Sequence, residues 1–129
     1  MKAIIAVNNL GYIGLNNRLP WKCSEDLKHF KQLTWNSNLI CGSITYKNLP
    51  KLGNRTILVW TRSSFGYWNK DELWCIGGKR TYETFSHAFK ELHISYIDDN
   101  TIGDTMFPDL KDLNPDCKIF KYYFDPNIK

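Results

Sequence analysis

The chain has 129 residues and a formal net charge of +4, with 43% hydrophobic and 23% charged residues. This composition is ordinary for a folded globular protein and excludes wholesale disorder, and the length suits a single domain over residues 1–129. No apolar run reaches the length of a membrane span, and the first residues lack the apolar region and cleavage site of a signal peptide. We therefore expect a cytoplasmic protein that does not associate with membranes.

The four cysteines lie far apart and form no CxxC pair. Without an export signal, free thiols are expected rather than disulfides. The three histidines, His29, His87 and His93, are scattered, and no pair of residues has the spacing of zinc ligands, so no metal is expected. The positive charges are dispersed, which favours a small anionic ligand such as a nucleotide cofactor over nucleic acid.

The first half of the chain alternates apolar runs with polar or helical segments. Residues 3–7 (AIIAV) are typical of a buried strand, and a polar loop rich in Gly and Asn follows. Ser24 is a good N-cap for an amphipathic helix that reaches about Trp35. The next predicted elements are a strand at 38–42 (NLICG), a short helix at 43–50 (SITYKNLP) and a β-branched strand at 55–61 (RTILVWT).

The second half continues this alternation. A strand at 73–76 (LWCI) leads into Gly77-Gly78, and residues 79–92 then have a helical period. Five apolar residues share one side of that predicted helix: Tyr82, Phe85, Ala88, Phe89 and Leu92. A strand at 93–98, a loop at 102–110 and a last strand at 118–124 complete the chain. Strands alternating with helices predict an α/β layered domain whose central, mostly parallel mixed sheet is flanked by helices.

Asp26 stands out because it shares the apolar face of the first helix with Phe30 and Thr34, at spacings of four residues. One interpretation is that Asp26 only complements the positive end of the helix dipole, as acidic residues in a first turn commonly do. The other places the carboxylate at the floor of an apolar cleft, where loss of water raises its pKa. Such a group suits a protonated nitrogen heterocycle or assists proton delivery. The helical pattern alone leaves both interpretations open.

Three strand-to-helix junctions carry polar or flexible residues. They are Gly77-Gly78 followed by Lys79 and Arg80, residues 41–45 (CGSIT), and Thr61 with Arg62. A glycine pair lets the backbone approach a ligand closely, and a helix N-terminus favours an anion. Each junction alone is more often structural, but together, in a basic protein, they indicate a phosphorylated ligand. The GxGxxG pattern of a standard Rossmann site is not present.

The order of motifs along residues 3–109 resembles the dihydrofolate reductase family. The motifs are IIAV, YIG, LPW, EDLKHF, ICGSITY, RTILVWTR, CIGGKRTYETF and IGDTMFPD. Each is weak alone, but the combination is specific. The resemblance implies NADPH-dependent reduction of 7,8-dihydrofolate to tetrahydrofolate, in support of one-carbon and thymidylate metabolism, in an oxidoreductase that antifolates bind. It also implies the dihydrofolate-reductase fold.

The resemblance implies roles for two catalytic residues. Asp26 would hydrogen-bond the pterin ring through N3 and the 2-amino group and favour protonation at N5, while hydride passes from nicotinamide C4 to pterin C6. Trp21 would fix a water molecule near the pterin. Residues 8–23 match a mobile loop that closes over the nicotinamide. Orientation and electrostatics in a dry cleft would then supply most of the catalysis.

The remaining site residues are also implied by the resemblance. The predicted substrate contacts are Ile4, Ile5, Leu27, Phe30, Leu49, Leu52, Arg55, Ile76 and Ser95, with Arg55 on the glutamate tail. The predicted NADPH contacts are Ala6, Ile13, Gly14, Leu19, Gly42, Ser43, Thr45, Thr61, Arg62, Gly77, Gly78, Lys79, Arg80, Thr81, Tyr82 and Thr105. The Gly77-Gly78 peptide is expected to be cis. No role is assigned to the histidines, which are expected on exposed helix or strand positions, and a monomer is expected.

The chain departs from the family pattern in three places. Only about a dozen residues separate Arg62 from Cys75, where the family has a further strand and helix beside the adenosine. Ser43 and Ile44 replace a basic residue and its neighbour, and Lys79 replaces a third glycine. We therefore expect Arg62, Lys79 and Arg80 to take over the phosphates. The C-terminus is short enough that one strand of the family's last hairpin is missing, so the sheet should have fewer strands than usual.

Two alternatives compete with this interpretation of the residues. One is a non-catalytic remnant that binds a nucleotide or pterin without turnover. The other is a reductase of similar fold that acts on a pyrimidine of riboflavin synthesis. A remnant is disfavoured by intact Asp26, Trp21, Arg55 and Gly77-Gly78. The LPW…EDL pairing with Arg55 favours folate over the pyrimidine.

Overall fold

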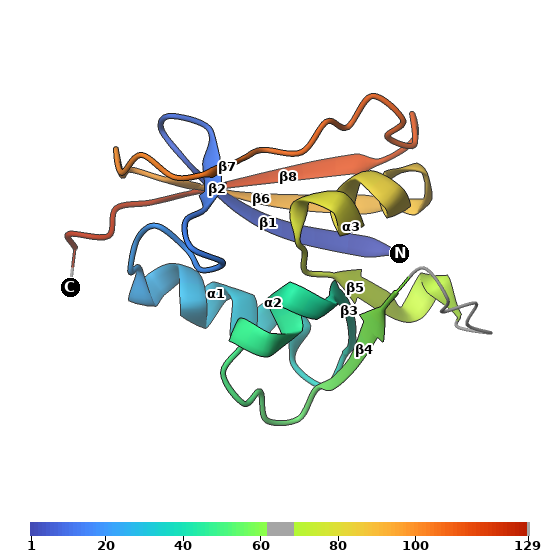
Figure 1. Cartoon of the computed structure of the whole chain (residues 1–129). Coiled ribbons are helices and arrows are strands. Elements are labelled where there is room, and N and C mark those ends of the chain that lie inside the picture. The colour runs from blue at the N-terminus through green and yellow to red at the C-terminus, as the bar shows by residue number, and fades with distance from the viewer. Residues whose placement is uncertain (62–68, 129) are drawn as a thin grey trace.

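The computed structural model describes residues 1–61 and 69–128, and a parallel β-sheet forms its centre (Figure 1). Within these residues the sheet contains β1 (Lys2–Asn8), β3 (Asn38–Gly42), β4 (Thr56–Trp60), β5 (Leu73–Cys75), β6 (Glu91–Ile97) and β8 (Lys118–Phe124). The strand order is β4-β3-β5-β1-β6-β8, and every neighbouring pair runs parallel. The expected α/β fold with a largely parallel sheet is confirmed.

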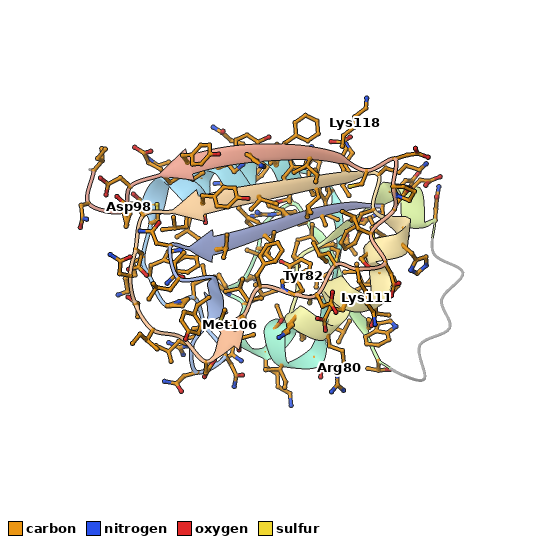
Figure 2. All side chains as sticks on the ribbon, turned by 90° about the horizontal axis from the view of Figure 1, so that it is seen from above. Arg80, Tyr82, Asp98, Met106, Lys111 and Lys118 are labelled. Atoms are coloured by element: carbon orange, nitrogen blue, oxygen red, sulfur yellow. The ribbon has the colours of Figure 1, made fainter. Side chains whose placement is uncertain are left out.

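A small antiparallel sheet and the helices complete the described residues. The small sheet pairs β2 (Tyr12–Gly14) with β7 (Thr105–Met106). The helices are α1 (Ser24–Thr34), α2 (Ser43–Asn48) and α3 (Lys79–Phe85), with short 3-10 turns at η1 (Lys70–Glu72) and η2 (Ser86–Ala88). Seen from above, β1, β6 and β8 run side by side in one direction (Figure 2). None of these helices is long and apolar enough to cross a membrane.

Alternate residues of the strands fill an apolar layer on each face of the sheet. On one face Ile4 and Trp74 pack against Phe30 of α1. On the other face Ile5 packs within a larger cluster that includes Tyr82 of α3. The two helices therefore cover opposite faces of the sheet. The loops after the parallel strands emerge together at the carboxyl edge, where ligands of open α/β sheets bind.

The start of α1 differs from the prediction, because Ser24 is the first helical residue and Cys23 is the N-cap. Cys23 has extended dihedral angles, and its carbonyl accepts the first helical hydrogen bond from the Leu27 amide at 3.1 Å. No side chain caps the helix. Glu25 and Asp26 in the first turn supply the negative charge that the helix N-terminus favours.

The helix predicted over 79–92 is also shorter than expected. The α3 helix ends at Phe85, η2 follows, and Leu92 lies in β6. Phe89 is fully buried, but it reaches the core from an extended connection. The apolar pattern correctly indicated buried positions there. It could not show that pairing between β6 and β1, which begins opposite Lys2, ends the helix early.

The C-terminal strand pairs in parallel with β6 along its whole length, from Glu91 opposite Lys118 to Ile97 opposite Phe124. The prediction of a trimmed central sheet agrees with the six strands of the described residues. The expected mixture of strand directions is not found within that sheet. In the described part of the chain, the antiparallel pairing lies instead between β2 and β7.

Candidate active site

Asp26 is buried in the first turn of α1, with only 6% of its surface exposed. Loss of hydration raises its pKa, while the Ser95 hydroxyl and the charge of His29 oppose that rise. No salt bridge to Asp26 forms among the described residues. The neighbouring Glu25 is exposed. The structure therefore favours the second interpretation of Asp26, a carboxylate held away from water.

Three side-chain atoms are buried without a hydrogen-bond partner among the described residues: Trp21 Nε1, His29 Nε2 and Ser95 Oγ. His29 and Ser95 interact electrostatically with the Asp26 carboxylate, although the hydroxyl makes no hydrogen bond of ordinary geometry. Trp21 packs beside Ala6 of β1, two residues from Ile4. A buried polar group without a partner costs about 1–3 kcal/mol, so such groups usually mark a place for a ligand or water.

Most of the predicted apolar walls gather in one cluster beside α1. Ile4, Phe30, Leu52 and Ile76 pack together there. Leu27 is 56% exposed and lies outside this cluster. Leu49 is half-buried. Ile5 packs on the opposite face of the sheet, so the structure does not bring it into the same cluster.

Arg55 lies at the end of this apolar cluster. Its guanidinium carbon is 5.9 Å from the ring centre of Phe30 and 5.8 Å from that of Trp35. Its Nε donates to the Gly53 carbonyl at 2.9 Å, and Nη1 reaches Thr34 Oγ1 at 3.5 Å. Among the described residues no carboxylate forms a salt bridge with it. The guanidinium is thus oriented by aromatic rings and has donors left for an anion.

The ends of β3 and β5 meet in a cradle built from glycine. The Gly42 amide donates to the Gly77 carbonyl at 2.9 Å. A Cβ atom on Gly42 would lie 3.1 Å from Thr81 Oγ1, and one on Gly78 would lie 3.2 Å from Thr45 Oγ1. The Gly77-Gly78 peptide is cis, as expected. A side chain at either glycine would crowd these threonines, so glycine keeps the backbone bare where β3 and β5 end, which suits close approach of a ligand such as a phosphate.

Tyr82 is buried at this junction, and its hydroxyl donates to the Ile4 carbonyl at 2.6 Å. Burial raises its pKa well above the ordinary value, so the hydroxyl stays neutral. This bond ties α3 to β1 and uses the hydroxyl proton. Lys79 is half-buried and Arg80 exposed at the first two positions of α3.

The loop after β1 is held against the main body by several hydrogen bonds. Asp104 Oδ2 accepts from the Asn16 amide at 2.9 Å, and the Asp104 amide donates to the Gly14 carbonyl at 2.9 Å. A Cβ on Gly103 would collide with the same Gly14 carbonyl. Thr105 Oγ1 donates to Asp104 Oδ1 at 2.9 Å. The β2–β7 ladder therefore determines where the loop lies.

The other predicted cofactor contacts are scattered around this edge. Ile13 packs against the larger core cluster, and Leu19 is exposed in the loop. Ser43 is exposed at the first position of α2, and Thr61 is exposed after β4. Arg62 lies outside the described residues.

The sequence analysis assigned no role to three residues that contact the loop or lie near Asp26. Gly103 and Asp104 were part of a matched motif but received no role, although they brace the loop. His29 was expected to be exposed, and that prediction is wrong, because its ring packs 4.1 Å from the Tyr122 ring and its Nε2 is buried. The helical spacing of three residues from Asp26 was the signal that could have indicated it.

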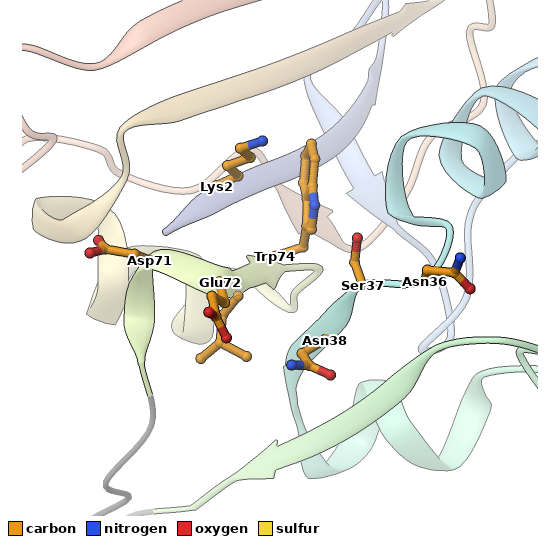
Figure 3. Close-up of a pocket in the computed structure, with 8 residues that line it drawn as sticks. Lys2, Asn36, Ser37, Asn38, Asp71, Glu72 and Trp74 are labelled. Atoms are coloured by element: carbon orange, nitrogen blue, oxygen red, sulfur yellow. The ribbon is translucent and has the colours of Figure 1, made fainter.

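A hollow of about 330 Å³ lies elsewhere, at the amino ends of β1, β3 and β5 (Figure 3). Lys2, Asn38, Asp71 and Trp74 are among its lining residues. Gly42 and Gly77 lie at the carboxyl ends of their strands, at the opposite edge, so this hollow is separate from the candidate site. No group of side chains among residues 1–61 and 69–128 has the composition of a metal site.

The comparisons with known proteins agree on one family. The family model for dihydrofolate reductase matches residues 1–69 and 66–118. The dihydrofolate reductase of Buchnera aphidicola subsp. Schizaphis graminum is 33% identical over 141 residues, covering 94% of this chain and 84% of that protein. The type 9 dihydrofolate reductase of Escherichia coli is 33% identical over 131 residues, covering 81% of this chain and 74% of that protein.

A solved structure extends the likeness to the fold. Dihydrofolate reductase from Enterococcus faecalis, complexed with NADP(H) and RAB-propyl, has a TM-score of 0.73 and 28% identity. The match covers 85% of this chain and 77% of that one. The family model matches most of this chain, and the two relatives named above are each 33% identical to it. The chain therefore belongs to the dihydrofolate reductase family.

Proposed function

We propose that this chain, as one domain over residues 1–129, reduces 7,8-dihydrofolate to 5,6,7,8-tetrahydrofolate with NADPH. The observation that carries the proposal is the Asp26 carboxylate, buried in the first turn of α1 next to the Ser95 hydroxyl. We also infer that it acts as a monomer in the cytoplasm. There its cysteines stay reduced, and all four are free thiols in the structure.

Asp26 is the group that recognises the substrate ring. Its two carboxylate oxygens accept hydrogen bonds from N3 and the 2-amino group of the pterin, and bonds to an ionised acceptor are the stronger kind. Ile4, Phe30 and Ile76 supply flat apolar contact for the ring. The burial that raises the pKa of Asp26 also strengthens its interaction with a ring that carries positive charge.

Trp21 and Arg55 would complete the substrate site. The unpartnered Nε1 of Trp21 can donate to a water molecule, through which a proton from solvent would reach pterin N5. The guanidinium of Arg55 presents a forked donor set to the carboxylate of the glutamate tail. Its stacking on Phe30 and Trp35 fixes the distance between that carboxylate and the ring site.

The glycine cradle fits a dinucleotide cofactor. Gly42 and Gly78 leave space that a Cβ would fill, next to the hydroxyls of Thr81 and Thr45. When bound, NADPH supplies the hydride for the reduction. The loop braced by Asp104 excludes water from that part of the site.

Lys79 and Arg80 place positive charge at the start of α3, and Arg62 adds a third cation from the sequence. We infer that these residues replace the family's usual phosphate-binding set. If they do, Arg62→Ala lowers the preference for NADPH over NADH. An unchanged preference would show that Arg62 has no such role.

The direct test follows NADPH absorbance with dihydrofolate as the second substrate. We expect NADPH oxidation that depends on dihydrofolate and stops when an antifolate is added. Binding of NADPH without turnover would contradict the proposal and indicate a non-catalytic protein. Oxidation with a pyrimidine of riboflavin synthesis, but not with dihydrofolate, would contradict it in favour of another substrate.

A further inference from the structure

His29 is a partly buried histidine that neither the substrate site nor the cofactor site uses. It follows Asp26 by three residues on α1, so both side chains leave the same face of the helix. Its ring centre lies 4.1 Å from that of Tyr122 and 5.4 Å from that of Phe124, both on β8. These rings fix the imidazole, while its Nε2 stays buried without a partner among the described residues.

The hydroxyl of Tyr122 on β8 is engaged by the neighbouring strand β6. That hydroxyl lies 2.9 Å from His93 Nδ1, and His93 Nε2 lies 2.9 Å from Glu91 Oε1. Tyr122 therefore touches His29 with its ring but gives its hydrogen bond to β6. The Tyr122 hydroxyl is therefore bonded to His93 and not to His29 Nε2.

The charged groups that face His29 are Asp26 on its own helix and His93 on β6. Burial lowers the pKa of His29, the Asp26 charge opposes that fall, and His93 adds to it. Burial raises the pKa of Asp26, and the His29 charge opposes that rise. Burial moves the titrations of the carboxyl and the imidazole toward each other, and the charge of each group favours the ionised form of the other.

We propose that His29 is a positioning residue for Asp26: on acidification its imidazole takes a proton from solvent and holds the Asp26 carboxylate in the ionised form that binds the pterin. The proton moves to a ring nitrogen of His29, and no other bond changes. The part that concerns the pterin rests on the proposed function. The part that concerns the coupled titration does not.

The plainer alternative is that His29 only fills space between α1 and β8. The variant His29→Phe distinguishes space filling from a role in protonation, because phenylalanine keeps a ring against Tyr122 and Phe124 but cannot take a proton. His29→Gln removes both the ring and the charge. His87→Phe is the matched control, since His87 is an exposed histidine in the 3-10 turn η2.

The test is a carbon-13 NMR titration of the Asp26 carboxyl in the ligand-free protein, assigned with Asp26→Asn. We expect two steps in the wild type, and in His29→Phe a single step whose midpoint lies at higher pH. His29→Gln should give the same single step, and His87→Phe should match the wild type. Curves for His29→Phe and wild type that coincide would overturn the proposal, whether or not the protein turns over.

A second measurement addresses the pterin. Dihydrofolate affinity at about pH 5.5, relative to that at about pH 8, should fall about threefold further in His29→Phe than in the wild type. An equal ratio in the two proteins, together with a coupled titration, would overturn the role toward the substrate. Absence of dihydrofolate binding by the wild type would instead count against the proposed function.

Discussion

Replacement of Asp26 by asparagine should stabilise the ligand-free protein at neutral and alkaline pH. The side chain is 6% exposed, and no salt bridge compensates for its lost hydration in the described residues. The rise in its pKa means that the folded protein holds this proton more tightly than the unfolded chain does. The contribution of the protonated Asp26 carboxyl to wild-type stability is therefore complete below its unfolded-state pKa. It is lost as the pH rises through the folded-state pKa.

The size of the stability gain in Asp26→Asn depends on how poorly the buried Asp26 charge is compensated. An unsatisfied buried group costs about 1–3 kcal/mol, and the position of Asp26 at the helix N-terminus offsets part of that cost, so we expect about 1–2 kcal/mol. Urea unfolding followed by tryptophan fluorescence, repeated over a pH series, measures this difference. At about pH 8 Asp26→Asn should be the more stable protein, and below about pH 4 the advantage should vanish.

The control is Glu25→Gln, which removes a carboxylate from the same helical turn at an exposed position. Its effect should stay within about 0.5 kcal/mol, because an exposed charge near a helix N-terminus contributes little. The reasoning is refuted if Asp26→Asn is no more stable than wild type at about pH 8, or if its advantage does not change with pH.

Three further predictions concern the cofactor cradle, the loop and the substrate tail. Gly42→Ala places a Cβ 3.1 Å from Thr81 Oγ1 and should weaken NADPH binding about tenfold in a fluorescence titration while leaving the fold intact. Asp104→Ala removes the acceptor for the Asn16 amide, so NADPH should dissociate several-fold faster in stopped-flow measurements; an unchanged rate would show that this bond does not hold the loop. Arg55→Ala should raise KM for dihydrofolate about tenfold or more with little change in kcat, and should have no effect on a pterin without a glutamate tail.

Much of the fold could be predicted because its signals are local. Short apolar runs such as residues 38–42 identify buried parallel strands, and the spacing of Asp26 and Phe30 places both on the sheet-facing side of α1. The Gly77-Gly78 junction could be found from its motif, since the positive φ of Gly77 and the close contacts at both positions favour glycine. The roles of the individual site residues stay predictions.

The features that were missed depend on contacts between distant parts of the chain. The helix after Gly78 ends at Phe85 because β6 must pair with β1, and this pairing is not visible in the helical period of residues 79–92. His29 is covered because β8 lies in parallel beside β6, and the sequence of α1 carries no sign of that neighbour. Local patterns indicate burial well, but they do not identify the element that covers a residue.

The central claim is that the buried Asp26 carboxylate binds the pterin and promotes its protonation. The most direct test is a single-turnover measurement in which dihydrofolate and NADPH are both bound before reduction is followed. Asp26→Asn should bind NADPH as the wild type does and should reduce dihydrofolate at least about 100-fold more slowly. Equal single-turnover rates in the two proteins would contradict the account.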